Sequence, residues 1–240
     1  MIIKLNAENG GYDIVLERGI IKRAGDELNL NRRVLIVTDS GVPEEYAQTV
    51  ASFCKTPVMA RVPMGEGSKS IAGLERLLTL MLDGGFTRSD CVIAVGGGVV
   101  GDLAGFAAAT YMRGIDFYNI PTTLLSQADS SIGGKTAVNL GGTKNIAGAF
   151  WQPSGVLIDP DTLATLPDSQ LRSGLAEIIK AGLIADAELF EYIEEAAAAE
   201  EGVDAAAILN KLNIERVLEA ALRVKKAVVE EDEREAGPRR

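Results

Sequence analysis

The stretch that decides the fold is CVIAVGGGVVGDLAGFAAATYM, residues 91–112. It begins with the apolar run CVIAV, passes through a turn with four glycines, and continues as the helical pattern LAGFAAATYM. A glycine-rich turn between a strand and a helix lets the backbone approach an anion, and the helix N-terminus offers free N–H groups and a partial positive charge. The turn departs from the G-x-G-x-x-G spacing of the common dinucleotide fingerprint. Nucleotide binding and a purely structural tight turn are therefore both compatible with this stretch.

Strand-like and helical patterns alternate on the N-terminal side of this stretch. VLIV at 34–37 is followed by the helical PEEYAQTVASF, the strand-like PVMARV and the helical SIAGLERLLTLMLDGG. Ser70 predicts the start of the last of these helices, and Gly84 with Gly85 predicts its end. Such alternation is typical of βαβ units and a parallel sheet. The N-terminus, MIIKLNAENGGYDIVLERG, alternates like a strand and lacks the long apolar run of a signal peptide or membrane span.

Strand-like runs disappear after Ile158, and the turn residues Asp159-Pro160-Asp161 predict a domain boundary there. We expect an α/β domain over 1–158 and an all-α domain over 159–240. Segment 186–204 has eight acidic residues and no basic one, which indicates a solvent-exposed helix face. The apolar stripe from Ile208 to Val229 needs a partner, and none is apparent further along. This indicates an unfinished domain or an intermolecular contact, because about 80 residues make a small independent core.

Composition narrows the function class. The 240 residues are 47% hydrophobic, and the 24 basic and 34 acidic residues give a net charge of −10. This charge argues against binding to nucleic acid or an anionic membrane and favours small-molecule chemistry. Cys54 and Cys91 are isolated among apolar neighbours, which predicts buried structural thiols and fits a reducing cytoplasm. The sequence contains no histidine, the commonest ligand of catalytic zinc.

Five motifs make the pattern far more specific: GEGSKS at 65–70, the long block GGGVVGDLAGFAAATYMRGIDFYNIPTTLLSQADSSIGGKTAVNLGGTKNIAGAFWQP at 96–153, IDPDTLATLP at 158–167, SGLAEIIKAGLI at 173–184 and KKAVVEEDEREAG at 225–237. Together they resemble the 3-dehydroquinate synthases of the sugar phosphate cyclase superfamily, over roughly residues 34–237. The resemblance implies a Rossmann-like NAD-binding domain followed by an incomplete helical domain for metal and substrate.

The resemblance also implies an activity. Family members are lyases that convert 3-deoxy-arabino-heptulosonate 7-phosphate into 3-dehydroquinate and phosphate, a step of the shikimate pathway of aromatic amino acid biosynthesis. They use transiently reduced NAD and a divalent metal, Zn or Co. An anionic sugar phosphate is then the expected ligand, and a homodimer is the expected assembly once the fold is completed.

The family's NAD contacts carry over to residues that follow the predicted strands: Asp39, Glu66, Lys69, Gly98, Val99, Val100, Gly101, Asp102, Thr122, Thr123, Lys135, Lys144, Thr162, Leu163, Ala164 and Thr165. A carboxylate such as Asp39 can accept hydrogen bonds from ribose hydroxyls, and threonine hydroxyls can bond polar cofactor edges. Without the resemblance, Asp39 is better interpreted as a turn cap and the two threonines at 122–123 as strand-end caps.

The family's catalytic and substrate contacts carry over to Arg113, Asp129, Lys135, Lys144, Asn145, Lys180 and Lys225. Several cations are needed because the substrate carries a carboxylate and a phosphate. Glu177 matches the family's one carboxylate metal ligand, and Lys180 lies three residues later on the same helix face. Any one of these lysines alone would be interpreted as exposed surface.

The family's other two metal ligands are histidines downstream of EDEREAG. Because this chain has no histidine, we expect an incomplete metal site and negligible turnover by this chain alone, and we hypothesise a truncation, a frameshift or a partial gene model. Arg239 is a candidate substrate-binding arginine, although its neighbour Pro238 is unusual. Gly141 and Thr143 replace the usual proline and glycine, which affects local loop geometry.

Two alternatives stay open. The chain is either a non-catalytic NAD-binding fragment or half of a split enzyme, which tight NAD binding without metal uptake would favour. The other alternative is a sister sugar phosphate cyclase that acts on another sugar phosphate, whereas the near-unbroken match over 96–153 makes a polyol dehydrogenase a poorer interpretation.

Overall fold

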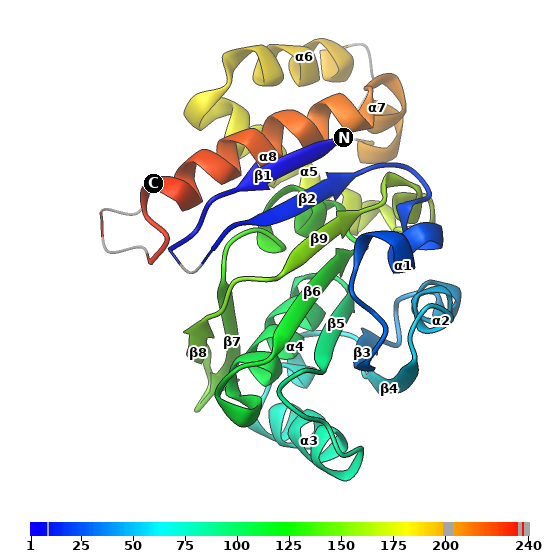
Figure 1. Cartoon of the computed structure of the whole chain (residues 1–240). Coiled ribbons are helices and arrows are strands. Elements are labelled where there is room, and N and C mark those ends of the chain that lie inside the picture. Colours follow the sequence, from blue (N-terminus) through cyan, green and yellow to red (C-terminus); the bar gives the residue numbers. More distant parts are fainter. Residues whose placement is uncertain (9, 199–203, 235–236, 238–240) are drawn as a thin grey trace.

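The computed structural model describes residues 1–8, 10–198, 204–234 and 237, and it shows a seven-stranded sheet beneath a group of helices (Figure 1). The strand order is β1-β2-β9-β6-β5-β3-β4; β1 is antiparallel to β2, and the other neighbours are parallel. Two further strands, β7 and β8, form a separate antiparallel pair. The bounds are β1 (Ile2–Leu5), β2 (Tyr12–Leu16), β3 (Arg33–Asp39), β4 (Thr56–Val62), β5 (Cys91–Gly96), β6 (Asp116–Pro121), β7 (Lys135–Leu140), β8 (Thr143–Phe150) and β9 (Gly155–Ile158).

Short 3-10 helices, one π-helical turn and eight α-helices complete the described part of the chain. Those up to residue 158 are η1 (Ile20–Arg23), α1 (Ala24–Glu27), α2 (Glu44–Ala51), η2 (Glu66–Ser68), α3 (Ile71–Asp83), α4 (Gly98–Thr110), η3 (Tyr111–Arg113) and the π-helical turn η4 (Ser126–Ser130). The helices after residue 158 are η5 (Pro160–Thr165), α5 (Asp168–Ala185), α6 (Ala187–Ala198), α7 (Ala205–Lys211) and α8 (Ile214–Glu231). The predicted start of α3 is confirmed, because the Ser70 side chain accepts a hydrogen bond from the backbone N–H of Gly73 at 3.1 Å.

The central strands are buried on both faces, and their side chains alternate between two clusters. In β3, Val34 and Ile36 pack with residues of η1 and α2, whereas Leu35 and Val37 pack with residues of α3 and α4. This period of two is what a strand between two helical layers requires. The predicted α/β class with a parallel sheet and a following helical part is confirmed.

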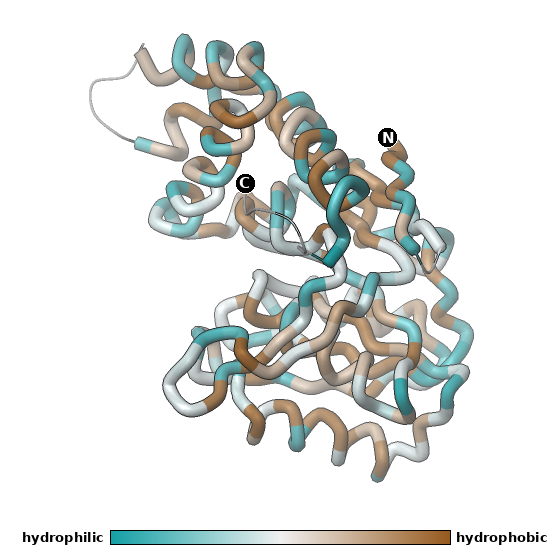
Figure 2. The backbone as a smooth tube through the Cα atoms, turned by 90° about the vertical axis from the view of Figure 1, so that its left-hand side faces the viewer, coloured by the Kyte–Doolittle hydropathy of each residue, from teal (hydrophilic) through white to brown (hydrophobic). Residues whose placement is uncertain are grey.

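The helical part shares its core with the first two strands. Val217, Leu218 and Leu222 of α8 are buried in the same cluster as Tyr12 and Ile14 of β2. The expectation that the apolar stripe on α8 lacks a partner in this chain is therefore wrong. Its partner comes from the opposite end of the sequence, where spacing along the chain gives no signal. Figure 2 shows the helical part, with its brown apolar residues, above the α/β part.

Hydrogen bonds fasten the turn after β1 to the end of α8. The backbone N–H and the side-chain amide of Asn6 donate to Glu230 Oε1 at 2.7 and 2.9 Å. Lys226 pairs with Glu230 at 2.6 Å, and the backbone N–H of Glu8 donates to Glu233 Oε2 at 2.8 Å. Because one core joins residues on both sides of it, the division at 158/159 stays a prediction.

Smaller expectations have mixed outcomes. The acidic residues of α6 and Asp204 are exposed, as predicted for a solvated face, whereas Glu200 and Glu201 lie outside the described residues. Cys91 is buried, but Cys54 is only partly buried, contrary to expectation, because it follows the last turn of α2. Burial raises the pKa of Cys91 to about 12 and that of Cys54 to about 11, so both are poor nucleophiles. Among the described residues, no helix has both the length and the apolar character to span a membrane.

Candidate cofactor and substrate site

The carboxyl ends of the parallel strands meet at one edge of the sheet. In open α/β sheets, ligands bind in the crevice beyond this edge. β3 ends at Asp39, and the glycine turn follows β5 directly. Thr122 and Thr123 follow β6, and η5, which contains Thr162 to Thr165, follows β9. The structure thus brings most of the predicted cofactor residues to one edge, although they lie far apart in the sequence.

The glycine turn at the N-terminus of α4 packs closely against the segments that follow β6, which leaves no room for a side chain at two of its positions. A Cβ atom at Gly97 would lie 3.0 Å from Thr123 Cγ2, and one at Gly98 would lie 2.9 Å from Ser130 Oγ. The hydroxyl of Ser130 is buried and has no hydrogen-bond partner in the described part of the chain. Backbone N–H groups, the helix dipole and an unsatisfied hydroxyl together fit a pyrophosphate. Sequence reasoning missed Ser130, because a serine within DSSIGG carries no charge or spacing signal.

Lys69 is the most deeply buried cation of the site, with 5% of its side chain exposed. It pairs with Asp102 in α4 and lies 3.9 Å from Glu66. Burial raises the pKa of Asp102, while the hydrogen bond from Lys69 opposes that rise. Asn139 in β7 completes the group, because its side-chain amide donates to Glu66 Oε1 at 2.8 Å and its backbone N–H donates to the Lys69 carbonyl at 2.9 Å. Asn139 was absent from the sequence predictions.

The predicted polar contacts differ in how far their groups are already engaged. The hydroxyl of Thr162 donates to the Asp159 carbonyl at 2.8 Å and accepts from Gln127 Nε2 at 2.9 Å, so it supports the turn after β9. Thr123 Oγ1 lies 2.8 Å from Ser126 Oγ. Asp39 accepts a hydrogen bond from the backbone N–H of Gly41 at 2.7 Å, which matches a turn cap and leaves its second oxygen for a ligand.

A pocket of about 600 Å³ lies beside this edge and is lined by residues of η4, β7, α5 and α8. Five predicted site residues line it: Asp129, Lys135, Glu177, Lys180 and Lys225. Lys225 Nζ lies 2.8 Å from Asp129 Oδ1. Lys180 pairs with Glu177, and this hydrogen bond raises the pKa of Lys180. Four separate segments therefore assemble one cluster of cations and carboxylates.

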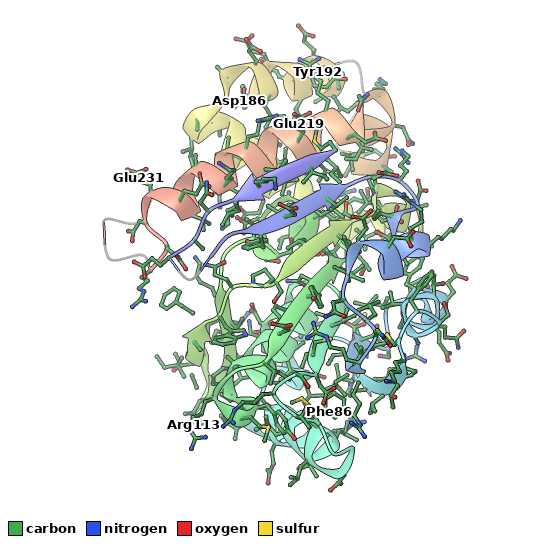
Figure 3. All side chains as sticks on the ribbon, viewed as in Figure 1. Phe86, Arg113, Asp186, Tyr192, Glu219 and Glu231 are labelled. Atoms are coloured by element: carbon green, nitrogen blue, oxygen red, sulfur yellow. The ribbon has the colours of Figure 1, made fainter. Side chains whose placement is uncertain are left out.

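Two more carboxylates line the same pocket and were missed by sequence reasoning. They are Glu231 and Asp232, at the end of α8. Figure 3 labels Glu231 at this end of the helix. Charge runs such as EEDERE are usually solvated, so their position facing a pocket emerges only once α8 is placed on the sheet.

Arg113, Lys144 and Asn145 do not line this pocket. Arg113 is exposed in η3 and has a φ of 73°, and Figure 3 places it well away from Glu231. Lys144 and Asn145 are exposed on β8. Asn145 is nevertheless tied to the cofactor edge, because its backbone N–H donates to Asn139 Oδ1 at 2.9 Å. Arg239 lies outside the described residues.

The metal does not fit what this part of the chain offers. A catalytic zinc site needs about three protein ligands. Among the described residues no group of three or more histidine, cysteine, aspartate or glutamate side chains is placed to hold a metal ion. Glu177 is thus a single candidate ligand in the described part of the chain.

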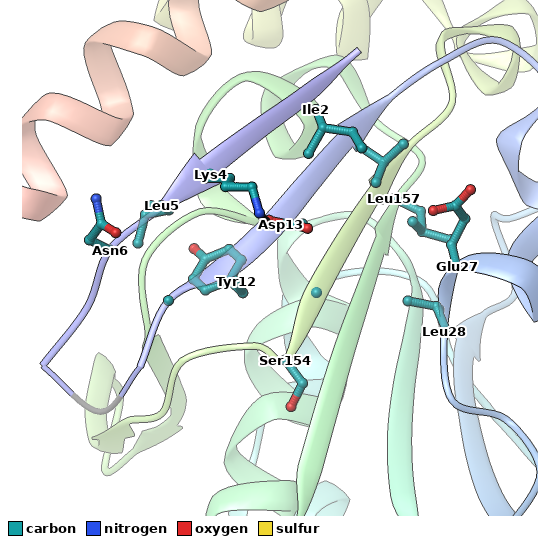
Figure 4. Close-up of a pocket in the computed structure, with 13 residues that line it drawn as sticks. Ile2, Lys4, Leu5, Asn6, Tyr12, Asp13, Glu27, Leu28, Ser154 and Leu157 are labelled. Carbon is teal, nitrogen blue, oxygen red and sulfur yellow. Dashed lines mark ion pairs between the residues drawn. The ribbon is translucent and has the colours of Figure 1, made fainter.

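A second pocket, of about 470 Å³, lies between the outer face of β1–β2 and α1 (Figure 4). Lys4 and Asp13 line it and pair across the two strands at 3.6 Å. None of the predicted site residues lines this second pocket.

Two family models match the chain in tandem. The model described as 3-dehydroquinate synthase N-terminal matches residues 59–173, and the one described as 3-dehydroquinate synthase C-terminal matches residues 174–240. The chain is 45% identical to the 3-dehydroquinate synthase of Desulforamulus reducens, over 99% of this chain and 66% of that protein. It is 42% identical to the 3-dehydroquinate synthase of Streptococcus suis, over 100% of this chain and 67% of that protein. The chain thus spans about two thirds of the length of these curated relatives.

Solved structures agree with the fold. A 2-epi-5-epi-valiolone synthase from Streptomyces hygroscopicus subsp. jinggangensis, with NAD+ and Zn2+ bound, has a TM-score of 0.78 and 32% identity, over 92% of this chain and 61% of that chain. A 2-deoxy-scyllo-inosose synthase complexed with carbaglucose-6-phosphate, NAD+ and Co2+ has a TM-score of 0.83 and 24% identity, over 98% of this chain and 65% of that chain. At that identity, the second structure supports the fold alone.

Proposed function

The chain belongs to the 3-dehydroquinate synthase family, and from this premise we propose that it forms the NAD-binding part and much of the substrate pocket of a lyase that converts 3-deoxy-arabino-heptulosonate 7-phosphate into 3-dehydroquinate and phosphate. The observation that carries the proposal is the pocket in which Lys135, Lys180 and Lys225 meet Asp129 and Glu177. The identity of 45% to a 3-dehydroquinate synthase, against 32% to a sister cyclase, favours this substrate.

NAD is the proposed cofactor, as in the valiolone synthase structure. Its proposed binding residues are those at the carboxyl edge of the sheet: the glycine turn with Ser130 for the pyrophosphate, Asp39 for a ribose, and the group of Glu66, Lys69 and Asp102. The unsatisfied Ser130 hydroxyl, which lies beside Gly98 at the N-terminus of α4, supports the fit. When bound, NAD supplies a reversible hydride acceptor. The buried Lys69–Asp102 pair fixes the first turn of α4 against the segment before α3.

The three lysines of the pocket are the proposed substrate cations. The substrate carries a carboxylate and a phosphate, and the chain as a whole has a net charge of −10. The pocket also holds the carboxylates of Asp129, Glu177, Glu231 and Asp232, so the lysines would hold an anionic ligand by direct contacts with their ammonium groups and not by a net positive charge. Lys225 and Lys180 are already oriented by Asp129 and Glu177, which reduces the entropy lost when they bind an anion. Glu177 is proposed as one ligand of a divalent metal whose other ligands the described residues do not supply. A homodimer is the proposed assembly.

The cofactor part of the proposal predicts that Gly98→Val weakens NAD binding at least about tenfold, because the new side chain displaces Ser130 and the turn at the helix N-terminus. A Cβ atom there already approaches Ser130 Oγ to 2.9 Å. Titration calorimetry with NAD measures the affinity. The matched control is Gly155→Ala at the start of β9, where a Cβ atom would meet its neighbours at 3.5 Å, an ordinary contact. Equal affinities of the two variants would count against NAD binding at this turn.

The activity is tested by complementation. The chain is mixed with a separate histidine-bearing fragment that covers the last third of a curated relative, and phosphate release from the heptulosonate phosphate is measured with NAD and zinc. Release from the mixture supports a competent pocket in this chain. If the chain binds NAD and associates with the fragment but the mixture stays silent, the proposed activity is wrong.

A further inference from the structure

The π-helical turn η4 (Ser126–Ser130) lies between the cofactor edge and the substrate pocket. Three of its side chains contact three different parts of the site. Gln127 bonds to the ends of β6 and β9, Asp129 pairs with Lys225, and Ser130 lies beside Gly98. π-Helical turns are rare and are frequent at functional sites. Of the three side chains, Gln127 alone has no place in the proposed function.

Gln127 is fully buried, with 0% of its surface exposed. Its Nε2 atom donates to the Pro121 carbonyl at 3.2 Å, the Asp159 carbonyl at 3.0 Å and Thr162 Oγ1 at 2.9 Å. The orientation of the amide is settled by its neighbours, because carbonyl oxygens only accept hydrogen bonds and the Oε1 atom could not face them. The Thr162 hydroxyl donates its own hydrogen to Asp159, which leaves its lone pairs for Gln127.

These bonds replace strand pairing where pairing has stopped. β6 and β9 pair only at Tyr118 with Gly155 and at Asn119 with Val156. Beyond these two pairs β6 and β9 are no longer paired with each other, although β6 stays paired with β5 up to Pro121 and β9 stays paired with β2 up to Ile158. The cofactor turns follow immediately. The Gln127 amide is therefore the connection between the two strand ends at the point where the chain leaves the sheet.

The buried Gln127 amide leaves one of its polar atoms without a hydrogen bond in the described part of the chain. Gln127 Oε1 is buried and has no hydrogen-bond partner among the described residues. An unsatisfied buried acceptor destabilises the fold, and an apolar side chain of the same volume would avoid burying it. An apolar side chain, however, would lack the Nε2 donor that joins Pro121, Asp159 and Thr162.

We propose that Gln127 is a positioning residue for the cofactor: by bridging Pro121, Asp159 and Thr162, it fixes the distance between the turn at Thr122–Thr123 and the turn at η5. It contacts neither cofactor nor substrate in this role. The inference rests on the proposed NAD function and adds a residue to it.

The test compares Gln127→Met, which keeps the volume and removes the donors, with Phe86→Leu. Phe86 is buried and lies in the loop before β5, at the opposite edge of the sheet, so its substitution reduces stability without touching the turns (Figure 3). We expect Gln127→Met to raise the Kd for NAD about tenfold, and Phe86→Leu to change it less than about twofold, at comparable loss of thermal stability. Equal Kd values for wild type and Gln127→Met would overturn the inference.

Thr162→Val supplies a second variant, because it removes one partner of Gln127 and keeps the side-chain shape. If the bridge is the cause, the double variant has the NAD affinity of Gln127→Met alone, and fully additive effects contradict it. Hydrogen exchange measured without cofactor tests the Gln127 bridge independently of the proposed NAD function. If wild type does not bind NAD, the proposed function fails. Faster exchange at the Thr162 and Leu166 amides in Gln127→Met, but not in Phe86→Leu, still supports the bridge, and unchanged exchange refutes it.

Discussion

Replacing Asp159 with alanine is expected to lower the free energy of unfolding by about 3 kcal/mol, because a buried carboxylate that accepts several backbone hydrogen bonds is lost. Asp159 is 3% exposed. Its Oδ1 atom accepts from the backbone N–H groups of Gly19 at 2.9 Å and Asp161 at 3.1 Å, and its Oδ2 atom accepts from Ile21 at 3.3 Å. Alanine leaves these donors without an acceptor, and it frees the turn after β9 from the segment that follows β2.

Urea unfolding measures this loss, and Asp161→Ala is the matched control. Asp161 is exposed and pairs with Arg18 at 2.7 Å, where both side chains are about half exposed to solvent. Solvent-exposed ion pairs contribute about 0–1 kcal/mol, so the control should be nearly neutral. If both variants unfold at the same urea concentration, the three backbone hydrogen bonds of Asp159 do not stabilise the fold as expected.

Gly174→Ala is expected to destabilise the chain by about 2–3 kcal/mol, although the same substitution usually stabilises an exposed helix. A Cβ atom at Gly174 would lie 2.5 Å from Leu124 Cβ and 2.6 Å from the backbone nitrogen of Leu125. The backbone neighbour cannot rotate away, so α5 has to move. Glu177 and Lys180 lie on the next turn of α5, and the pocket they line should lose its shape together with the stability.

Thermal unfolding, with Ser173→Ala as the control, tests whether Gly174→Ala lowers the stability of the chain. Ser173 precedes Gly174 in the same helix, is exposed, and bonds only to the Ser169 carbonyl in the described structure, at 3.2 Å. Its replacement should leave the midpoint unchanged or raise it slightly. A Gly174→Ala variant as stable as Ser173→Ala would show that α5 does not pack against Leu124 and Leu125 as closely as described.

Local patterns predicted the elements well because their causes are local. The alternation in β3, the Ser70 cap and the glycine turn before α4 each depend on residues within a few positions of one another. The partner of α8 could not be predicted in this way. Its contacts with β1 and β2 join opposite ends of the sequence, and neither pattern specifies the other.

The site residues also divide into those that a sequence motif predicts and those that depend on contacts between distant parts of the sequence. Charged residues such as Lys69 and Lys225 were predicted through the family motifs. Asn139, Ser130 and Gln127 were missed. Asn139 and Gln127 matter through hydrogen bonds to residues far away in the sequence, and Ser130 through a buried hydroxyl without a partner among the described residues, and none of these features is visible in the sequence. Arg113 shows the opposite case, since its motif is clear but this chain does not bring it to the pocket.

The packing of β1 and β2 against α8 has a consequence for the order in which the chain folds. The hairpin is synthesised long before α8, because the bond from Asn6 to Glu230 spans 224 residues. Until β9 and α8 have been made, the apolar face formed by Ile3, Leu5 and Ile14 has no partner, and a lone hairpin is marginally stable in water. Such a high contact order slows folding and leaves an exposed strand edge during translation. The hairpin is therefore synthesised early but reaches its native contacts only after α8 has been made.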